Sequence, residues 1–208
     1  ANQVDGIISG SHNLGISDYD RVTAPIISFD RNLSPSIPVV SSDNYAGGTL
    51  AAETLVKSGA KKIIMITGND NSNSPTGLRH AGFASVLPTA PIINVSSDFS
   101  PIRKEMEIKN ILKNRKPDAI FASDDLTAIL IMKVAQELGV NISEELKVIG
   151  YDGTYFVENY YPQLATIQQP LKDIACLLVD LLLRKIEGEE IPTTGYFLPV
   201  HLSSGKSI

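Results

Sequence analysis

Three short apolar segments of this chain end in acidic residues, and this recurrence limits the folds that the chain can adopt. Residues 147–152 read Lys-Val-Ile-Gly-Tyr-Asp, residues 118–125 end in Ser-Asp-Asp, and residues 26–31 end in Asp-Arg. In an open parallel α/β sheet, ligands bind beyond the carboxyl ends of the strands. The pattern therefore predicts strand ends that present carboxylates to a polar ligand.

Strand and helix patterns alternate along the whole chain. Helical spacing of apolar residues follows Asp43 as far as Gly59, and recurs over 126–138 and 171–186. Fully apolar strands that alternate with helices predict an α/β fold, with parallel sheets covered by helices on both faces. The expected strands are 4–9, 26–29, 39–41, 63–67, 92–95, 119–122, 148–151, 165–168 and 196–198.

The first expected strand, 4–9, carries apolar residues on both faces, which is typical of an interior strand. No earlier strand is available to pair with it, and a strand that is buried on both faces needs neighbours. We therefore expect this chain to be the later part of a longer protein.

Composition restricts the location and the partners of the chain. Its 208 residues are 43% hydrophobic and 20% charged, with a net charge of −5, as in ordinary globular proteins. The sequence shows no apolar run of about 18 residues and no signal-peptide pattern, and Cys176 is its single cysteine. These features favour the cytoplasm and predict no membrane contact. Since no block of Lys and Arg is longer than two, this segment by itself is not expected to bind nucleic acid.

Catalytic and metal-binding patterns find little support. His12, His80 and His201 are scattered, without the paired spacing of a metal site. The G-x-S-x-G, P-loop and G-x-G-x-x-G motifs are absent from the sequence. The sequence therefore predicts a protein that is not an enzyme, with no metal and no cofactor.

A series of motifs follows in unbroken order along the chain. The motifs are Val4-Asp-Gly-Ile-Ile, Pro25-Ile-Ile-Ser-Phe-Asp-Arg, Pro38-Val-Val-Ser-Ser-Asp-Asn with Gly47-Gly48, Ser58-Gly-Ala-Lys-Lys-Ile-Ile-Met-Ile-Thr-Gly, Arg79-His-Ala-Gly-Phe, Asp98-Phe99, Pro117-Asp-Ala-Ile-Phe-Ala-Ser-Asp, Val148-Ile-Gly-Tyr-Asp and Pro162-Gln-Leu-Ala-Thr-Ile-Gln-Gln-Pro. Together they resemble the effector-binding core of the lactose/galactose repressor family of bacterial transcription regulators. The resemblance extends from residue 4 to about residue 204.

The resemblance implies a periplasmic-binding-protein-like fold, in which two parallel-sheet lobes are joined by three crossovers near Ser41, Gln169 and Tyr196. The N-terminal lobe would comprise 1–41 plus 170–195 and would be incomplete, and the C-terminal lobe would comprise 42–169 plus 196–208. The resemblance also implies a homodimer, with 44–55 and the segment around residue 83 as its interface. It implies operator DNA as a partner, bound through a helix-turn-helix domain that this chain does not contain.

The same resemblance assigns a ligand site between the lobes. Alternative roles remain open for four of its residues: Asp152 and Asp124 as helix caps, Arg79 as a solvated helix residue, and Asp30 as the ion-pair partner of Arg31. Ser123 stands where relatives often carry Asn, so its hydrogen-bonding pattern is altered. The expected ligand-binding residues are Asp30, Arg79, Phe99, Ser123, Asp124, Asp152 and Gln169.

Two or three acids with one arginine suit a small uncharged sugar better than a sugar phosphate, which would require more Lys and Arg. The leading hypothesis is the sugar-sensing core of a repressor, in which the ligand shifts the relative orientation of the lobes and thereby alters operator binding. Two alternatives are an extracytoplasmic sugar-binding receptor of a transporter and a catabolite-control-type regulator that senses a phosphocarrier protein.

Overall fold

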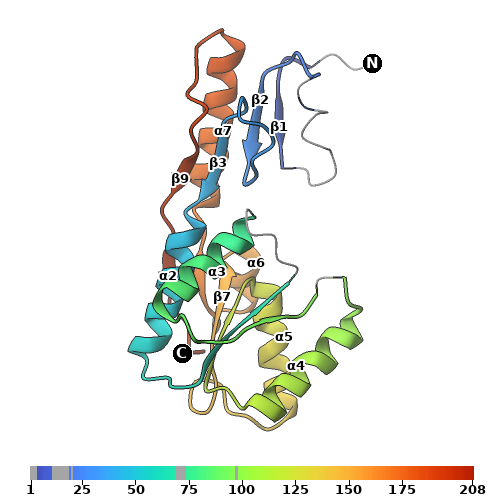
Figure 1. The fold of residues 1–208 in the computed structure, drawn as a ribbon, viewed down its shortest axis with the longest axis vertical. Helices are drawn as coiled ribbons and strands as arrows, with labels where there is room; N and C mark the ends of the chain where they lie inside the picture. The colour runs from blue at the N-terminus through green and yellow to red at the C-terminus, as the bar shows by residue number, and fades with distance from the viewer. Residues whose placement is uncertain (1–3, 11–18, 20, 69–73, 97) are drawn as a thin grey trace. The chain divides into compact units, whose positions relative to one another are not determined.

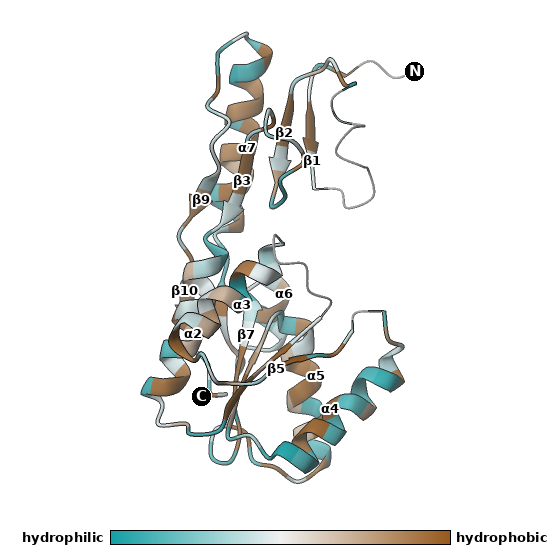
Figure 2. Cartoon of the chain, in the orientation of Figure 1, coloured by the Kyte–Doolittle hydropathy of each residue, from teal (hydrophilic) through white to brown (hydrophobic). Residues whose placement is uncertain are grey.

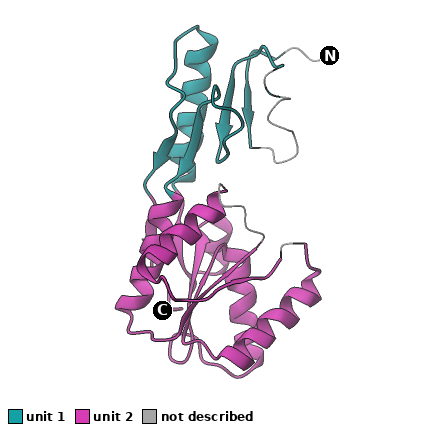
Figure 3. Ribbon diagram, viewed as in Figure 1, with its two compact units in different colours: residues 1–43, 170–199 teal, residues 44–169, 200–208 magenta. Residues whose placement is uncertain are grey.

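The computed structural model describes residues 4–10, 19, 21–68, 74–96 and 98–208. The chain divides into two units, and it passes between them after residues 43, 169 and 199 (Figure 3). Unit 1 comprises 1–43 and 170–199, and unit 2 comprises 44–169 and 200–208. These limits lie two and four residues beyond the expected ones at 41 and 195, because the third strand continues to Ser42 and the strand at 196–198 pairs within unit 1.

Unit 1 contains a four-stranded sheet in the order β1-β2-β3-β9, and every pairing in it is parallel. The long helix α7 (Leu171–Ile186) packs on this sheet (Figure 1). The strands are β1 (Ile7–Ser9), β2 (Ile26–Phe29), β3 (Val39–Ser42) and β9 (Tyr196–Leu198).

The core of unit 1 forms where Ile27 and Val40 meet the apolar face of α7, including Ile174 and Leu181. Burial of such aliphatic side chains stabilises a fold by about 1.5–3 kcal/mol each. The first strand differs from its expected form. Ile8, in the middle of β1, is 43% exposed, and among the described strands β1 pairs with β2 alone.

Unit 2 contains a six-stranded sheet in the order β10-β8-β7-β6-β4-β5. All neighbours are parallel except β10 and β8. The strands are β4 (Ile63–Thr67), β5 (Ile92–Asn94), β6 (Ala119–Ala122), β7 (Lys147–Asp152), β8 (Ala165–Gln168) and β10 (His201–Ser203). The predicted α/β fold with parallel sheets is therefore confirmed.

Helices cover both faces of the unit 2 sheet (Figure 1). Alternate residues of β4 face opposite sides, so that Ile64 packs with α4 (Pro101–Arg115) and α5 (Asp125–Glu137), whereas Met65 packs with α2 (Asn44–Lys57) and α3 (Pro75–Val86). Figure 2 shows hydrophobic strands at the centre and helix α4 with one polar and one apolar side. This two-sided burial explains why the central strands are apolar throughout.

The sequence patterns do not predict β10, which runs antiparallel to β8 with Leu202 opposite Ile167. Strand β8 leads to the passage out of unit 2 at residue 169, and β10 follows the return at residue 199. Two neighbouring strands, one leaving and one entering, run in opposite directions. The sheet is therefore mixed at this edge.

Helices α2 and α3 approach each other at two glycines. A Cβ on Gly48 would lie 2.0 Å from the carbonyl oxygen of Arg79, and a Cβ on Gly82 would lie 2.0 Å from that of Tyr45. Glycine permits this backbone-to-backbone contact. Leu55 and Phe83 of these helices are 0% exposed inside unit 2, and the expected dimer interface on the two helices stays a prediction.

The short helix α6 (Tyr155–Tyr160) follows β7 and is not predicted by the sequence patterns. Three of its aromatic side chains, Tyr155, Phe156 and Tyr160, are exposed. Within the described residues, we find no helix with both the length and the hydrophobicity needed to cross a membrane.

The close contact of α2 and α3 leads to a first prediction. The variant Gly82→Ala should lower the free energy of unfolding by about 1–3 kcal/mol, because the added methyl group forces the two helices apart. Ala81→Ser adds one heavy atom at an exposed position of the same helix and should change stability by less than about 0.5 kcal/mol. Urea unfolding measures both variants, and equal stabilities would show that the helices separate without cost.

Candidate functional site

Polar side chains gather at the carboxyl edge of the unit 2 sheet. The parallel strands β6 and β7 end there, at Ala122 and Asp152, and β8 ends beside them at Gln168. The edge is where an open parallel α/β sheet binds ligands. Four of the residues predicted for the ligand site, Arg79, Ser123, Asp152 and Gln169, meet at this edge.

The guanidinium of Arg79 lies at the centre of this cluster. Its Nε donates a hydrogen bond of 2.8 Å to Asn44 Oδ1, and its Nη1 donates one of 2.6 Å to the Ser123 carbonyl. Its Nη2 lies 3.7 Å from Asp152 Oδ1, and its Cζ lies 3.6 Å from the ring centroid of Tyr151. Arg79 is only 6% exposed. The structure thus contradicts a solvated helix arginine and favours a structural or ligand-binding role.

Asp152 is held in an unusual backbone conformation at the end of β7. Its φ is 121°, and Gly153 follows with a φ of 61°. Gln169 donates from its backbone N to the Asp152 carbonyl at 3.0 Å, and from its Nε2 to Asp152 Oδ1 at 2.6 Å. Thr154, rather than Asp152, is the N-cap residue of α6. The capping role is therefore excluded, and the Asp152 carboxylate, about a third exposed, stays accessible to a ligand.

Asp124 performs the capping role that the sequence left open. Its carboxylate accepts hydrogen bonds from the backbone N of Thr127 at 2.8 Å and from the Thr127 hydroxyl at 2.9 Å, at the start of α5. Ser123 is 3% exposed, and its hydroxyl donates to Asp124 Oδ2 at 3.4 Å. Both residues lie at the edge, but the contacts of Asp124 already account for its position.

Phe99 lies between β5 and α4 and packs partly buried against the apolar cluster of α4 and α5. The guanidinium carbon of Arg103 lies 3.7 Å from the centroid of its ring. The contacts of the described residues do not join Phe99 to Arg79 or Asp152. A hollow of about 350 Å³ lies nearby, lined by Val95, Asp124 and neighbours. Core packing is sufficient to explain this aromatic side chain.

Asp30 belongs to unit 1, where it follows β2 with a φ of 65°. Its Oδ1 accepts a hydrogen bond of 2.6 Å from the hydroxyl of Ser41, which fixes the carboxylate at the strand end. The alternative ion pair with Arg31 is not seen among the described residues. Instead, Arg31 Nε is buried without a hydrogen-bond partner. A buried donor that lacks an acceptor is rare and calls for an explanation.

Asp125 is a residue that the sequence patterns do not single out. It is 3% exposed, and its carboxylate accepts hydrogen bonds from the Gly153 backbone N at 2.8 Å and the Thr166 hydroxyl at 2.6 Å. Burial, opposed by these two bonds, raises the pKa of the Asp125 carboxyl from 3.8 to about 6. Gly150 provides the space, because a Cβ there would lie 2.2 Å from Asp125 Oδ1. In the sequence, the only signals for this buried carboxylate were Gly150 and Thr166 on the neighbouring strands.

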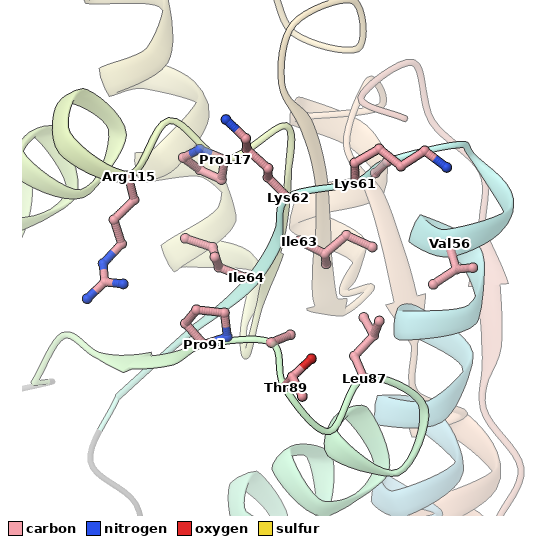
Figure 4. A pocket seen from close by; sticks show the side chains of 12 residues that line it. Val56, Lys61, Lys62, Ile63, Ile64, Leu87, Thr89, Pro91, Arg115 and Pro117 are labelled. Carbon is pink, nitrogen blue, oxygen red and sulfur yellow. The ribbon is translucent and has the colours of Figure 1, made fainter.

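Other hollows of unit 2 lie away from this cluster. One of about 540 Å³ is found at the amino ends of β4 and β6, between Ile63 and Pro117 (Figure 4). Figure 4 shows the charged ends of Lys61, Lys62 and Arg115 directed away from one another around it. Because these cations do not converge, the hollow does not form an anion site.

The two described histidines, His80 and His201, do not assemble with other metal-ligating side chains of the described residues. His80 is buried and bonds to the Thr67 hydroxyl at 2.8 Å, and His12 lies outside the described residues. Across the described part of the chain, no three His, Cys, Asp or Glu side chains are placed to hold a metal ion.

Comparisons with known proteins agree with the fold. Residues 52–208 match the model of a periplasmic binding protein-like domain. The chain is 65% identical over 208 residues to the sucrose operon repressor of Streptococcus mutans, and 52% identical over 209 residues to that of Lactococcus lactis. All of this chain aligns with the first and 99% with the second, and it spans 65% and 64% of their lengths.

A solved structure is also similar. It is a periplasmic binding protein/LacI transcriptional regulator from Alkaliphilus metalliredigens, complexed with D-xylulofuranose. The identity is 30% and the TM-score is 0.86, over 99% of this chain and 78% of that one.

The raised pKa of Asp125 predicts a pH dependence of stability. Between pH 4 and 6 the folded state retains a proton on Asp125 that the unfolded state has lost, so this group makes stability fall as pH rises through that window. By pH 7 this loss in the free energy of unfolding approaches about 3 kcal/mol. In Asp125→Asn this decrease should disappear. Urea unfolding between pH 4 and 7 tests it, with the exposed Asp173→Asn as control, and parallel wild-type and Asp125→Asn curves would contradict it.

Proposed function

Because this chain belongs to the family of periplasmic binding protein-like domains found in LacI-type transcriptional regulators, we propose that it is the sugar-sensing core of a bacterial operon repressor. The observation that carries this proposal within the structure is the buried Arg79 guanidinium, which faces Asp152 at the carboxyl edge of the unit 2 sheet. Charged donors and acceptors of this kind make the stronger hydrogen bonds to hydroxyl groups.

The ligand of this proposal is a small uncharged sugar. Arg79, Asp152 and Gln169 of unit 2 supply a guanidinium, a carboxylate and an amide, which together can donate to and accept from hydroxyl groups. Asp30 of unit 1 supplies a second carboxylate, already oriented by Ser41. We propose Ser123, Asp124 and Phe99 as secondary contributors, since other contacts account for the positions of Asp124 and Phe99.

Arg31 joins the proposed ligand residues, although the sequence suggested only an ion pair for it. Its Nε is cut off from water and has no acceptor among the described residues, which costs about 1–3 kcal/mol when left unmatched. Because the Nε is as closed to a ligand hydroxyl as it is to water, a ligand contact of Arg31 would be made through its Nη nitrogens.

The regulatory step follows from differential affinity. A ligand that makes more contacts in one arrangement of the two units than in another shifts the equilibrium toward that arrangement. The passages at residues 43, 169 and 199 are the positions at which such a change would bend the chain. Gln169, which holds Asp152, is itself the last residue before one of them.

In the longer protein, we propose that this shift alters operator binding by a separate DNA-binding domain and that the repressor acts in the cytoplasm as a homodimer. The names of the relatives, sucrose operon repressors, support this proposal over a transport receptor or a catabolite-control regulator. Coupling between sugar and operator of about 1–3 kcal/mol would be typical.

Isothermal titration calorimetry tests the ligand class. We expect binding of a sugar from a panel of sucrose, fructose, glucose and ribose, and much weaker binding of the corresponding phosphates. The variant Asp152→Asn should weaken binding about 10–100-fold, because a charged acceptor is lost. Its melting temperature should fall by about 2–4 °C, because Asn retains an oxygen for Gln169 but the buried Arg79 loses its charged partner. A variant that loses stability but not affinity would disprove the assignment.

Arg31→Gln provides a second prediction for the same site. It removes a guanidinium whose Nε is unmatched in the free protein, so stability should stay the same or rise slightly. Sugar affinity should fall about 10-fold or more. Arg21→Gln, at an exposed position of the same unit, should change neither quantity. Calorimetry and thermal melting measure both, and a loss of stability with unchanged affinity would contradict the prediction.

A further inference from the structure

The Asp125 carboxylate joins three neighbouring elements of unit 2. It stands at the first position of α5, accepts from the hydroxyl of Thr166 on β8, and accepts from the backbone N of Gly153 just beyond β7. Its Oδ1 lies close to Gly150, where a side chain would not fit. Asp125 therefore fixes the position of the β7 end relative to α5 and β8.

The segment that Asp125 holds is the turn that presents Asp152. Positive φ angles at Asp152 and Gly153 are costly for a residue with a side chain, and such a conformation persists only when its surroundings hold it. The Gly153 backbone N donates to Asp125, and the Gly153 carbonyl accepts from Gln168 Nε2 at 3.1 Å. The turn is thus held through both backbone polar groups of a single residue, Gly153.

We propose that Asp125 is a positioning residue of the sugar site. Its ionised carboxylate holds the Gly153 N–H and thereby keeps Asp152 in its ligand-binding orientation, so that sugar affinity falls when Asp125 takes up a proton. This inference rests on the proposed function for its ligand, but the turn itself can be observed without one.

The surroundings of Asp125 place this protonation near pH 6. Burial, together with the charges of Asp152 on β7 and of Asp124 at the N-cap of α5, raises the pKa of the Asp125 carboxyl to about 6, against the bonds from Thr166 and Gly153. A charged acceptor makes a hydrogen bond roughly twice as strong as a neutral one. Protonation therefore weakens the bond that holds the turn.

Nuclear magnetic resonance can follow this bond directly. Labelling with carbonyl-¹³C aspartate and ¹⁵N glycine selects Asp-Gly pairs, and the sequence contains two, 5–6 and 152–153. Asp5→Asn removes the first signal and assigns the second. We expect the Gly153 amide proton to move downfield in one step centred near pH 6, as its acceptor becomes charged.

Three variants separate positioning from general stability. Asp125→Asn should abolish the step. Thr166→Val removes a bond that lowers the pKa of Asp125, so the step should move to higher pH in a protein whose strand packing is preserved. Asp124→Asn, the control, should keep the step. A wild-type amide without a step, or a step that persists in Asp125→Asn, overturns the inference.

Affinity is measured with sucrose by calorimetry at pH 7.5 and 5.5. The wild type should bind about 3–4-fold more weakly at the lower pH, where a group with a pKa of about 6 is about three-quarters protonated, whereas Asp125→Asn should differ less than about twofold between the two. An equal pH dependence in both proteins overturns the inference. Absence of sucrose binding at both pH values counts against the proposed ligand, and the Gly153 step then decides the inference by itself.

Discussion

A guanidinium that is almost cut off from water requires acceptors on every side, and the polar cluster of unit 2 is organised by this requirement at Arg79. Asn44, Ser123 and Asp152 reach it from a helix, a strand end and a second strand end. Charged groups are tolerated in such positions only when they are paired and hydrogen-bonded. Because Asp152 lies 3.7 Å from the guanidinium, at the limit of an ion pair, it retains capacity for a ligand.

Two glycines in and around this cluster allow the backbone to lie unusually close to neighbouring groups. Gly48 lies against the Arg79 carbonyl, which brings the first residue of α2 within reach of the guanidinium. Gly150 makes the equivalent space for Asp125 beneath the end of β7. Glycine is the residue that allows such close approaches, at the cost of conformational entropy in the unfolded chain. Packing and site geometry are therefore set by the same few positions.

The sequence predicts the parts of this fold in which local and tertiary preferences agree. The limits of α7 at 171 and 186 match because Pro170 and Gly188 bound its apolar pattern, and the strands 63–67 and 119–122 match because they are apolar on both faces. Helix α6 and strand β10 were missed, since six and three residues are too few to show a periodicity. For β10, the pairing depends on where the chain re-enters unit 2.

The local sequence also fails to predict the different roles of the neighbours Asp124 and Asp125. Both follow an apolar strand and precede a helix, so their local signals are alike, yet one caps α5 and the other is buried with a pKa raised to about 6. The difference is decided by what stands on adjacent strands, where Gly150 leaves space and Thr166 supplies a donor. A chain read from end to end does not show which strands will be neighbours. The strained turn at Asp152 is likewise maintained by residues far from it in sequence, Asp125 and Gln169, because a positive φ persists only where the surroundings hold it.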